Sequence, residues 1–120
     1  INDDYYNNYR QVFLDLVGKA HAKGVKIAVG VDLGGYHYDP TLSAREIKVL
    51  IEAGLTPMQA IQAGTSVGAE LLQWQDKVGA IKVGLLADII AVRGNPLNNI
   101  ALLEKVTFVM KDGEVIKNEH

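Results

Sequence analysis

Residues 26–35, K-I-A-V-G-V-D-L-G-G, constrain the fold of this chain most strongly. They begin with a short, mostly apolar run, which is typical of a strand buried on both faces in a parallel α/β sheet. Gly34 and Gly35 then allow the chain to turn sharply. Asp32 would therefore lie at the C-terminal end of the strand, where α/β folds place their chemistry. The alternative is that Asp32 only caps a turn.

The residues before this run predict a helix that begins near Asp3 or Asp4 and ends before Gly24. Its apolar residues recur at helical spacing and share one face: Val12, Phe13, Leu16, Val17 and Ala20. A helix that leads directly into a buried strand is the αβ step of a parallel-sheet protein. The first third of the chain therefore predicts an α/β fold.

Residues 33–42, which follow Asp32, have an irregular pattern that predicts a loop. Loops at the end of a strand often carry function. His37 stands between Tyr36 and Tyr38 and is a candidate for contact with a substrate or a metal. The alternative is a surface histidine with no chemical role.

Three helices are predicted after this loop. The sequence S-A-R-E at 43–46 has the form of a capping box, and T-P-M-Q at 56–59 opens the next helix with Thr, Pro and Gln in the favoured positions. A third helix begins at Thr65 or Ser66 and ends near Trp74, which we expect to be a core anchor.

The pattern changes after Trp74 to short runs rich in Val and Ile, separated by glycines. Residues 87–92 predict a strand, and residues 98–104 a short helix or loop. Two further runs flank Asp112-Gly113, which is a strong signal for a two-residue hairpin turn. The chain thus predicts helices around one buried strand in residues 1–76 and a small, mostly antiparallel sheet in residues 77–120.

Composition excludes several classes of partner. The net charge is −2 and the basic residues are scattered, so a nucleic-acid partner is not expected. The chain has no cysteine, no signal peptide at its start and no apolar run of about 18 residues that could span a membrane. These absences favour a cytoplasmic protein without a membrane partner.

Residues 52–117 closely resemble the C-terminal end of the metal-dependent amidohydrolases, and the likeness is best to the branch of prolidase-like Xaa-Pro dipeptidases and imidazolonepropionase-like enzymes. The matching sequences are E-A-G-L-T-P-M-Q-A-I-Q-A-G-T at 52–65, G-A-I-K-V-G-L-L-A-D-I-I-A-V at 79–92, G-N-P-L at 94–97 and V-M-K-D-G at 109–113. Upstream, G-V-D-L-G-G resembles the family's G-T-D-x-G at the end of the eighth barrel strand.

This resemblance implies a fold and a chemistry. The chain would be the C-terminal piece of a TIM-barrel hydrolase, with the last barrel strand and its helices followed by part of a small β-sandwich domain. Asp32 would bind a divalent metal, zinc by expectation, and act as general base in the hydrolysis of an amide or peptide bond. Dipeptides or N-acyl amino acids are the implied substrates, and His37 is a weaker candidate for substrate contact.

The chain also departs from the family pattern. It has no His-x-His pair, and its histidines are His21, His37 and His120, which cannot supply the family's ligand set. Catalytic zinc normally takes three protein ligands and a water. Val31 also replaces the usual hydroxyl residue before the aspartate. We therefore expect the isolated chain to be inactive and to bind no metal.

Two other functions stay open from the sequence. The chain could be a non-catalytic assembly module that uses its helical and sheet surfaces. A small-anion site at Gly34-Gly35 is weaker, because two glycines do not make a phosphate loop. A homo-oligomer is expected, because without flanking barrel strands the 26–31 backbone and apolar helix residues such as Phe13 and Leu16 would lack partners.

Overall fold

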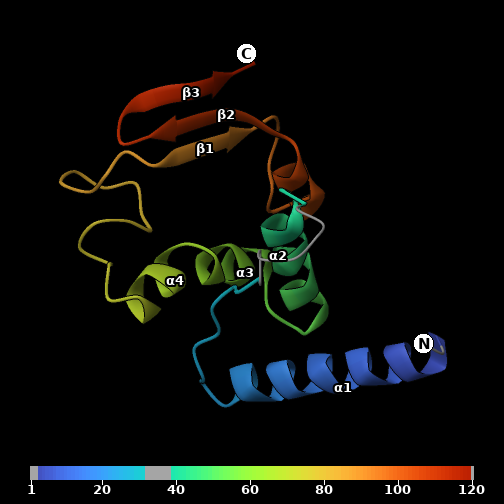
Figure 1. Cartoon of the computed structure of the whole chain (residues 1–120). Coiled ribbons are helices and arrows are strands. Elements are labelled where there is room, and N and C mark those ends of the chain that lie inside the picture. Colours follow the sequence, from blue (N-terminus) through green and yellow to red (C-terminus); the bar gives the residue numbers. More distant parts are fainter. Residues whose placement is uncertain (1–2, 32–38, 120) are drawn as a thin grey trace.

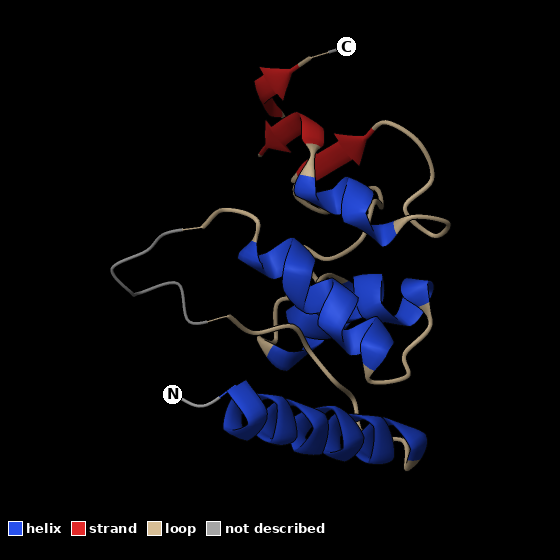
Figure 2. Cartoon of the chain, turned by 90° about the vertical axis from the view of Figure 1, so that its right-hand side faces the viewer, coloured by secondary structure: helices blue, strands red, loops and turns tan. Residues whose placement is uncertain are grey.

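The computed structural model describes residues 3–31 and 39–119, which form helices and one small antiparallel sheet. Helix α1 lies at one end of the molecule and the sheet at the other, with α2, α3 and α4 between them (Figure 1). The same order of layers is seen after a quarter turn (Figure 2). The elements are α1 (Asp3–Ala22), α2 (Leu42–Glu52), α3 (Pro57–Ala63), α4 (Ser66–Leu71), β1 (Ile89–Val92), the 3-10 helix η1 (Ile100–Glu104), β2 (Val106–Lys111) and β3 (Glu114–Asn118).

The predicted strand at 26–31 is not a strand in this structure, so that prediction is wrong here. The segment still contributes to the core. Ile27 and Val29 pack against a buried cluster from α2, α3 and the turn between them, made of Leu50, Leu55, Ala60 and Ala63. The Val29 backbone N–H donates to the Ala63 carbonyl at 3.0 Å. A parallel strand needs neighbouring strands for its ladder, and no strand of the described chain lies beside this one.

Helix α1 confirms the predicted helix and ends as expected, with Gly24 at φ +86°. It approaches α2 closely at Gly18, where an added Cβ would lie 2.4 Å from the Ala53 carbonyl oxygen. Of the apolar face predicted for this helix, Val17 packs on the core cluster. The residues nearer its start (Val12, Phe13 and Leu16) are exposed. No other element of the described chain covers them, so this face is left open to solvent.

One of the predicted helix starts is confirmed, and another is wrong. Thr56 confirms its capping box: its Oγ1 accepts from the Gln59 N–H at 3.3 Å, and its own N–H donates to Gln59 Oε1 at 2.9 Å. Ser43 does not cap α2, because the N-cap is Thr41 and the helix begins at Leu42, two residues earlier than predicted. The chain at this point is held instead by Asp39, whose Oδ1 accepts from the Thr41 N–H at 2.8 Å.

The sheet has the strand order β1-β2-β3, and all pairs are antiparallel. Asp112 and Gly113 connect β2 to β3 with φ angles of +49° and +83°. Two successive positive φ angles are the mark of a type I′ turn, so the hairpin prediction is confirmed. The predicted strand at 87–92 is confirmed from Ile89 onward, and η1 confirms the short helix before β2.

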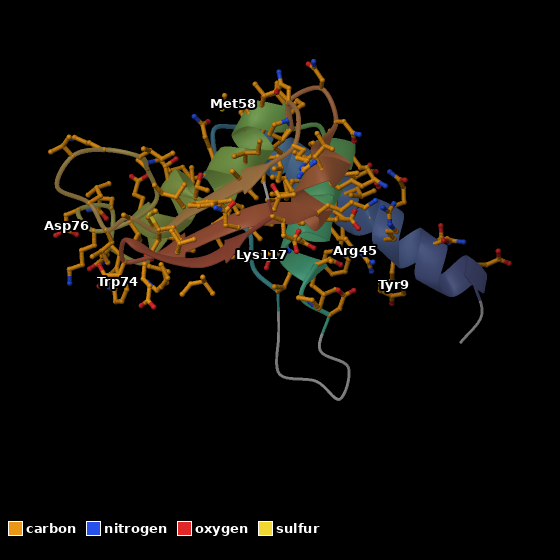
Figure 3. All side chains as sticks on the ribbon, turned by 90° about the horizontal axis from the view of Figure 1, so that it is seen from above. Tyr9, Arg45, Met58, Trp74, Asp76 and Lys117 are labelled. Carbon is orange, nitrogen blue, oxygen red and sulfur yellow. The ribbon has the colours of Figure 1, made fainter. Side chains whose placement is uncertain are left out.

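Trp74 was expected to anchor the core, and this prediction is wrong. Its side chain is 53% exposed. It lies at the end of the molecule opposite Tyr9 (Figure 3), and the Lys77 ammonium sits 5.4 Å from its ring centre. The described elements leave this end uncovered, so the indole has no apolar surroundings to enter.

Among the described residues, no helix is both long and apolar enough to cross a bilayer.

Candidate functional site

The two predicted site residues, Asp32 and His37, lie in the stretch 32–38, outside the described residues. The structure does describe both flanks of this stretch. Val31 precedes it and lines a groove between the helices and the sheet. Asp39 follows it and lies in a polar cluster at the start of α2. The candidate site is therefore built from what these flanks contact.

Asp39 is held by three groups. One of its carboxylate oxygens accepts from the Thr41 N–H at 2.8 Å and from the Thr41 hydroxyl at 2.7 Å, and the other lies 2.9 Å from a guanidinium nitrogen of Arg45. The hydrogen bonds from Thr41, with a smaller contribution from the Arg45 charge, lower the pKa of Asp39. The carboxylate is therefore ionised at neutral pH, and the chain is fixed where residues 32–38 end.

Arg45 connects this cluster to the sheet side of the molecule. Its Nε lies 3.5 Å from a carboxylate oxygen of Glu104, the last residue of η1. The guanidinium thus bridges two carboxylates from segments far apart in the sequence. An exposed bridge of this kind contributes little to stability, so it accompanies the packing of α2 near η1 and does not cause it.

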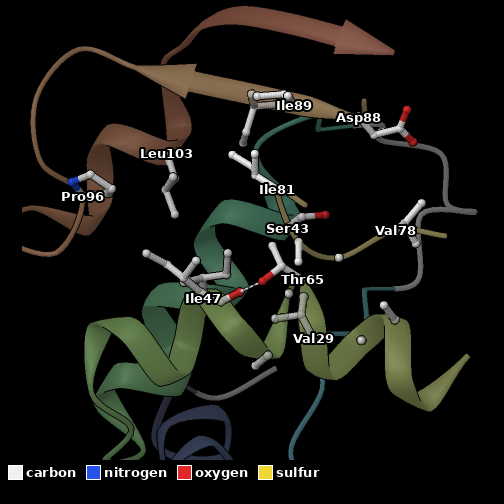
Figure 4. A pocket seen from close by; sticks show the side chains of 18 of the residues that line it. Val29, Ser43, Ile47, Thr65, Val78, Ile81, Asp88, Ile89, Pro96 and Leu103 are labelled. Atoms are coloured by element: carbon white, nitrogen blue, oxygen red, sulfur yellow. Dashed lines mark hydrogen bonds between the residues drawn. The ribbon is translucent and has the colours of Figure 1, made fainter. Parts of the chain in front are cut away.

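The groove that Val31 lines has a volume of about 770 Å³. Figure 4 shows Val29, Ile47 and Thr65 on its helical side, and Ile89 and Leu103 on its sheet side. Most of its other lining residues are also apolar, including Ile61, Leu72, Val78 and Val92. The groove therefore favours an apolar occupant.

Two polar side chains in the groove wall, those of Thr65 and Asp88, already have partners within the protein. The Thr65 hydroxyl donates to the Ile61 carbonyl at 2.8 Å. Asp88 accepts from the Asp112 N–H at 2.7 Å through one carboxylate oxygen and from the Lys111 ammonium at 2.6 Å through the other. The hydrogen bond from Lys111, followed by that from Asp112, lowers the pKa of Asp88. Asp88 thus holds the β2–β3 turn onto the chain before β1.

The residues present do not make a metal site within the part of the chain that the structure describes. No group of three His, Cys, Asp or Glu side chains comes together among these residues. His21 lies at the end of α1. Any metal site that uses Asp32 would need further ligands.

The structural roles of Asp39, Arg45 and Asp88 were not predicted from the sequence. A signal existed for Asp39, because Asp-Pro-Thr is suited to an Asx turn in which the carboxylate accepts from the backbone two residues later. The bridge from Arg45 to Glu104 joins residues 59 positions apart, and the Asp88 contacts also depend on the folded chain. Neither set of contacts leaves a local sequence pattern from which it could have been predicted.

A family model and a solved structure each match most of this chain. A model of the amidohydrolase family matches residues 7–116. The crystal structure of a Xaa-Pro dipeptidase with methionine bound in its active site is 42% identical, with a TM-score of 0.79 over 88% of this chain and 25% of that chain.

Two further relatives are an ochratoxinase and an adenine deaminase. Ochratoxinase from Aspergillus niger is 32% identical over 116 residues, which is 89% of this chain and 23% of that protein, and its crystal structure gives a TM-score of 0.75. Adenine deaminase 4 from Rhizobium meliloti is 36% identical over 73 residues, 58% of this chain and 12% of that protein. The chain spans about a quarter of the length of the first two relatives.

Proposed function

Because this chain belongs to the amidohydrolase family, we propose that the protein that carries it hydrolyses the C–N bond of dipeptides or N-acyl amino acids. The observation that carries the proposal is the 42% identity to a Xaa-Pro dipeptidase over 88% of this chain. Because the chain spans only 25% of that dipeptidase, the remainder of the site would come from other residues of a protein of that length.

Asp32 is the residue of this chain to which we assign the chemistry. It follows Val31, and the sequence G-V-D-L-G-G resembles the aspartate motif of the family. A positioned carboxylate can take the proton of the attacking water and later give it to the leaving amine. His37, five residues further on, is assigned to substrate contact with weaker support, since only its place in the sequence favours it.

Members of this family are generally metal-dependent. A bound divalent ion, for which we propose zinc, would lower the pKa of a coordinated water. The described residues supply no set of three ligands for it, and the chain has no His-x-His pair, so we propose that Asp32 would be one ligand among others that a protein of the relatives' length supplies. For the same reason we propose that the 120-residue chain has no hydrolase activity of its own.

The first experiment tests the reaction class. A protein of the relatives' length that carries this chain is assayed for amine release from Xaa-Pro dipeptides, N-acyl amino acids and adenine, with zinc present. Turnover of a dipeptide or N-acyl amino acid is expected. Release of ammonia from adenine alone would instead support a deaminase and would overturn the proposed substrate class.

The second experiment uses the 120-residue chain alone with the same dipeptides and N-acyl amino acids. No turnover above buffer is expected with zinc added, because one carboxylate cannot hold both a metal and a water. Turnover that disappears in Asp32→Asn would show that the isolated chain has a working site.

A further inference from the structure

The two flanks of the stretch 32–38 are fixed to the helices by separate contacts. Before the stretch, the Val29 N–H donates to the Ala63 carbonyl of α3 at 3.0 Å. After it, the Asp39 carboxylate is held at the start of α2 by Thr41. Since α2 and α3 share one buried cluster, both flanks are tied to the same group of helices. A variant can therefore loosen one flank and leave the other in place.

The hydroxyl of Thr41 is used for Asp39 and not for the helix. Thr41 is the N-cap residue of α2, but its side chain makes no capping hydrogen bond. The hydroxyl donates instead to Asp39 Oδ1 at 2.7 Å. Thr56, at the same position of α3, does cap its helix. Because a side-chain cap stabilises the start of a helix, α2 lacks a contact that α3 has, and the same hydroxyl holds Asp39.

Asp39 is restricted from two other directions. It precedes Pro40, whose ring fixes its own φ and limits the backbone of the residue before it. The second carboxylate oxygen of Asp39 lies 2.9 Å from the guanidinium of Arg45, which also lies against Glu104 of η1. A carboxylate with these donors and a restricted backbone has few other arrangements.

We propose that the cluster of Asp39, Thr41 and Arg45 positions the side chain that contacts the substrate. This rests on the proposed function, in which that side chain belongs to His37 and the chemistry to Asp32. His37 lies two residues before Asp39, whereas Asp32 lies seven residues before it and close to the other flank. Loss of the Asp39 contacts therefore lowers the fraction of molecules that are ready to bind substrate, which raises KM and leaves kcat near its original value.

Steady-state kinetics test this role. In a protein of the relatives' length that carries this chain, kcat and KM are measured with zinc present for the dipeptide or N-acyl amino acid that it hydrolyses. Asp39→Asn and Arg45→Gln should each raise KM by about tenfold and change kcat by less than about twofold. Asp76→Asn makes the same change as Asp39→Asn on an exposed side chain at the Trp74 end of the molecule (Figure 3), and should leave both constants unchanged.

Two further comparisons separate positioning from a general loss of structure. Thr41→Ser keeps the hydroxyl and should leave KM unchanged, whereas Thr41→Val removes it and should raise KM as Asp39→Asn does. The double variant of Asp39→Asn with Arg45→Gln should raise KM no more than either single variant, because both singles break the same contact. Exposed ion pairs contribute little to overall stability, so these variants should melt close to the unchanged protein by circular dichroism.

The outcomes distinguish this proposal from the proposed function. No turnover of any dipeptide or N-acyl amino acid by the unchanged protein would refute the proposed function, and the positioning role with it. Normal turnover with KM unmoved in folded Asp39→Asn and Thr41→Val would overturn the positioning role alone. A fall in kcat at constant KM would show that the cluster acts on the chemistry of Asp32 and would also overturn it. If Asp39→Asn does not fold, the comparison of Thr41→Ser with Thr41→Val decides.

Discussion

A single methyl group added at Gly79 should destabilise the fold more than the same change at Gly84. Both glycines have a left-handed backbone, with φ of +96° and +94°. At Gly79 an added Cβ would lie 2.6 Å from the Cβ of Ala69 and 3.0 Å from the Thr65 carbonyl oxygen. At Gly84 it would meet nothing within 4 Å. The two positions therefore share the backbone strain and differ only in the packing.

The expected magnitudes follow from these two terms. An alanine in the left-handed region costs about 1–2 kcal/mol, which is the whole effect expected for Gly84→Ala. Overpacking a tight contact adds about 1–3 kcal/mol, and Ala69 is buried on α4, where the backbone cannot easily move away. Gly79→Ala should therefore lower the free energy of unfolding by about 2–5 kcal/mol.

Urea unfolding followed by circular dichroism, at one protein concentration, measures both variants. Ala69→Gly should restore part of the loss in Gly79→Ala, because it removes one of the overlapping atoms, although the glycine itself costs about 1 kcal/mol in a helix. Equal destabilisation by Gly79→Ala and Gly84→Ala would refute the packing of residue 79 on α4.

Three further predictions follow from other contacts. Asp88→Asn should be less stable than the unchanged chain at pH 7, and the difference should shrink as the pH falls below about 3.8, because a carboxylate with a lowered pKa loses its stabilising effect on protonation; identical urea curves at pH 7 would contradict this. Thr56→Ala should lower the free energy of unfolding by about 1 kcal/mol and Thr56→Ser by less, since serine keeps the cap; a larger loss with serine would exclude the capping role. Iodide should quench the fluorescence of Trp74 efficiently, because its indole is half exposed, and strong protection in a monomeric sample would show that the side chain is covered.

The parts of the fold that the sequence predicted are those determined by neighbouring residues. The Thr56–Gln59 capping box joins residues three apart, and the Asp112-Gly113 turn needs two positive φ angles that these residue types readily adopt. Both features were confirmed because their causes are local. The family was also predicted correctly, because its characteristic sequences lie within residues 52–117.

The parts that the sequence did not predict depend on distant partners. Apolar composition suggested a strand at 26–31 and a buried Trp74, but a ladder needs a neighbouring strand and an indole needs a covering surface. The described chain supplies neither. The cluster of Asp39 and Arg45 beside the predicted site was missed for a related reason, since the bridge to Glu104 exists only once η1 has packed near α2.

The central claim is that Asp32 carries the chemistry of an amidohydrolase. The most direct test replaces this carboxylate with a neutral amide and measures the rate of hydrolysis. In a protein of the relatives' length that carries this chain, kcat/KM for a Xaa-Pro dipeptide is compared between the unchanged protein, Asp32→Asn and Asp76→Asn, where Asp76 is an exposed carboxylate at the Trp74 end of the molecule (Figure 3). Loss of a general base predicts a fall of about 10²–10⁴-fold for Asp32→Asn, with no change for Asp76→Asn. A kcat/KM for Asp32→Asn within twofold of the unchanged protein would contradict the assignment.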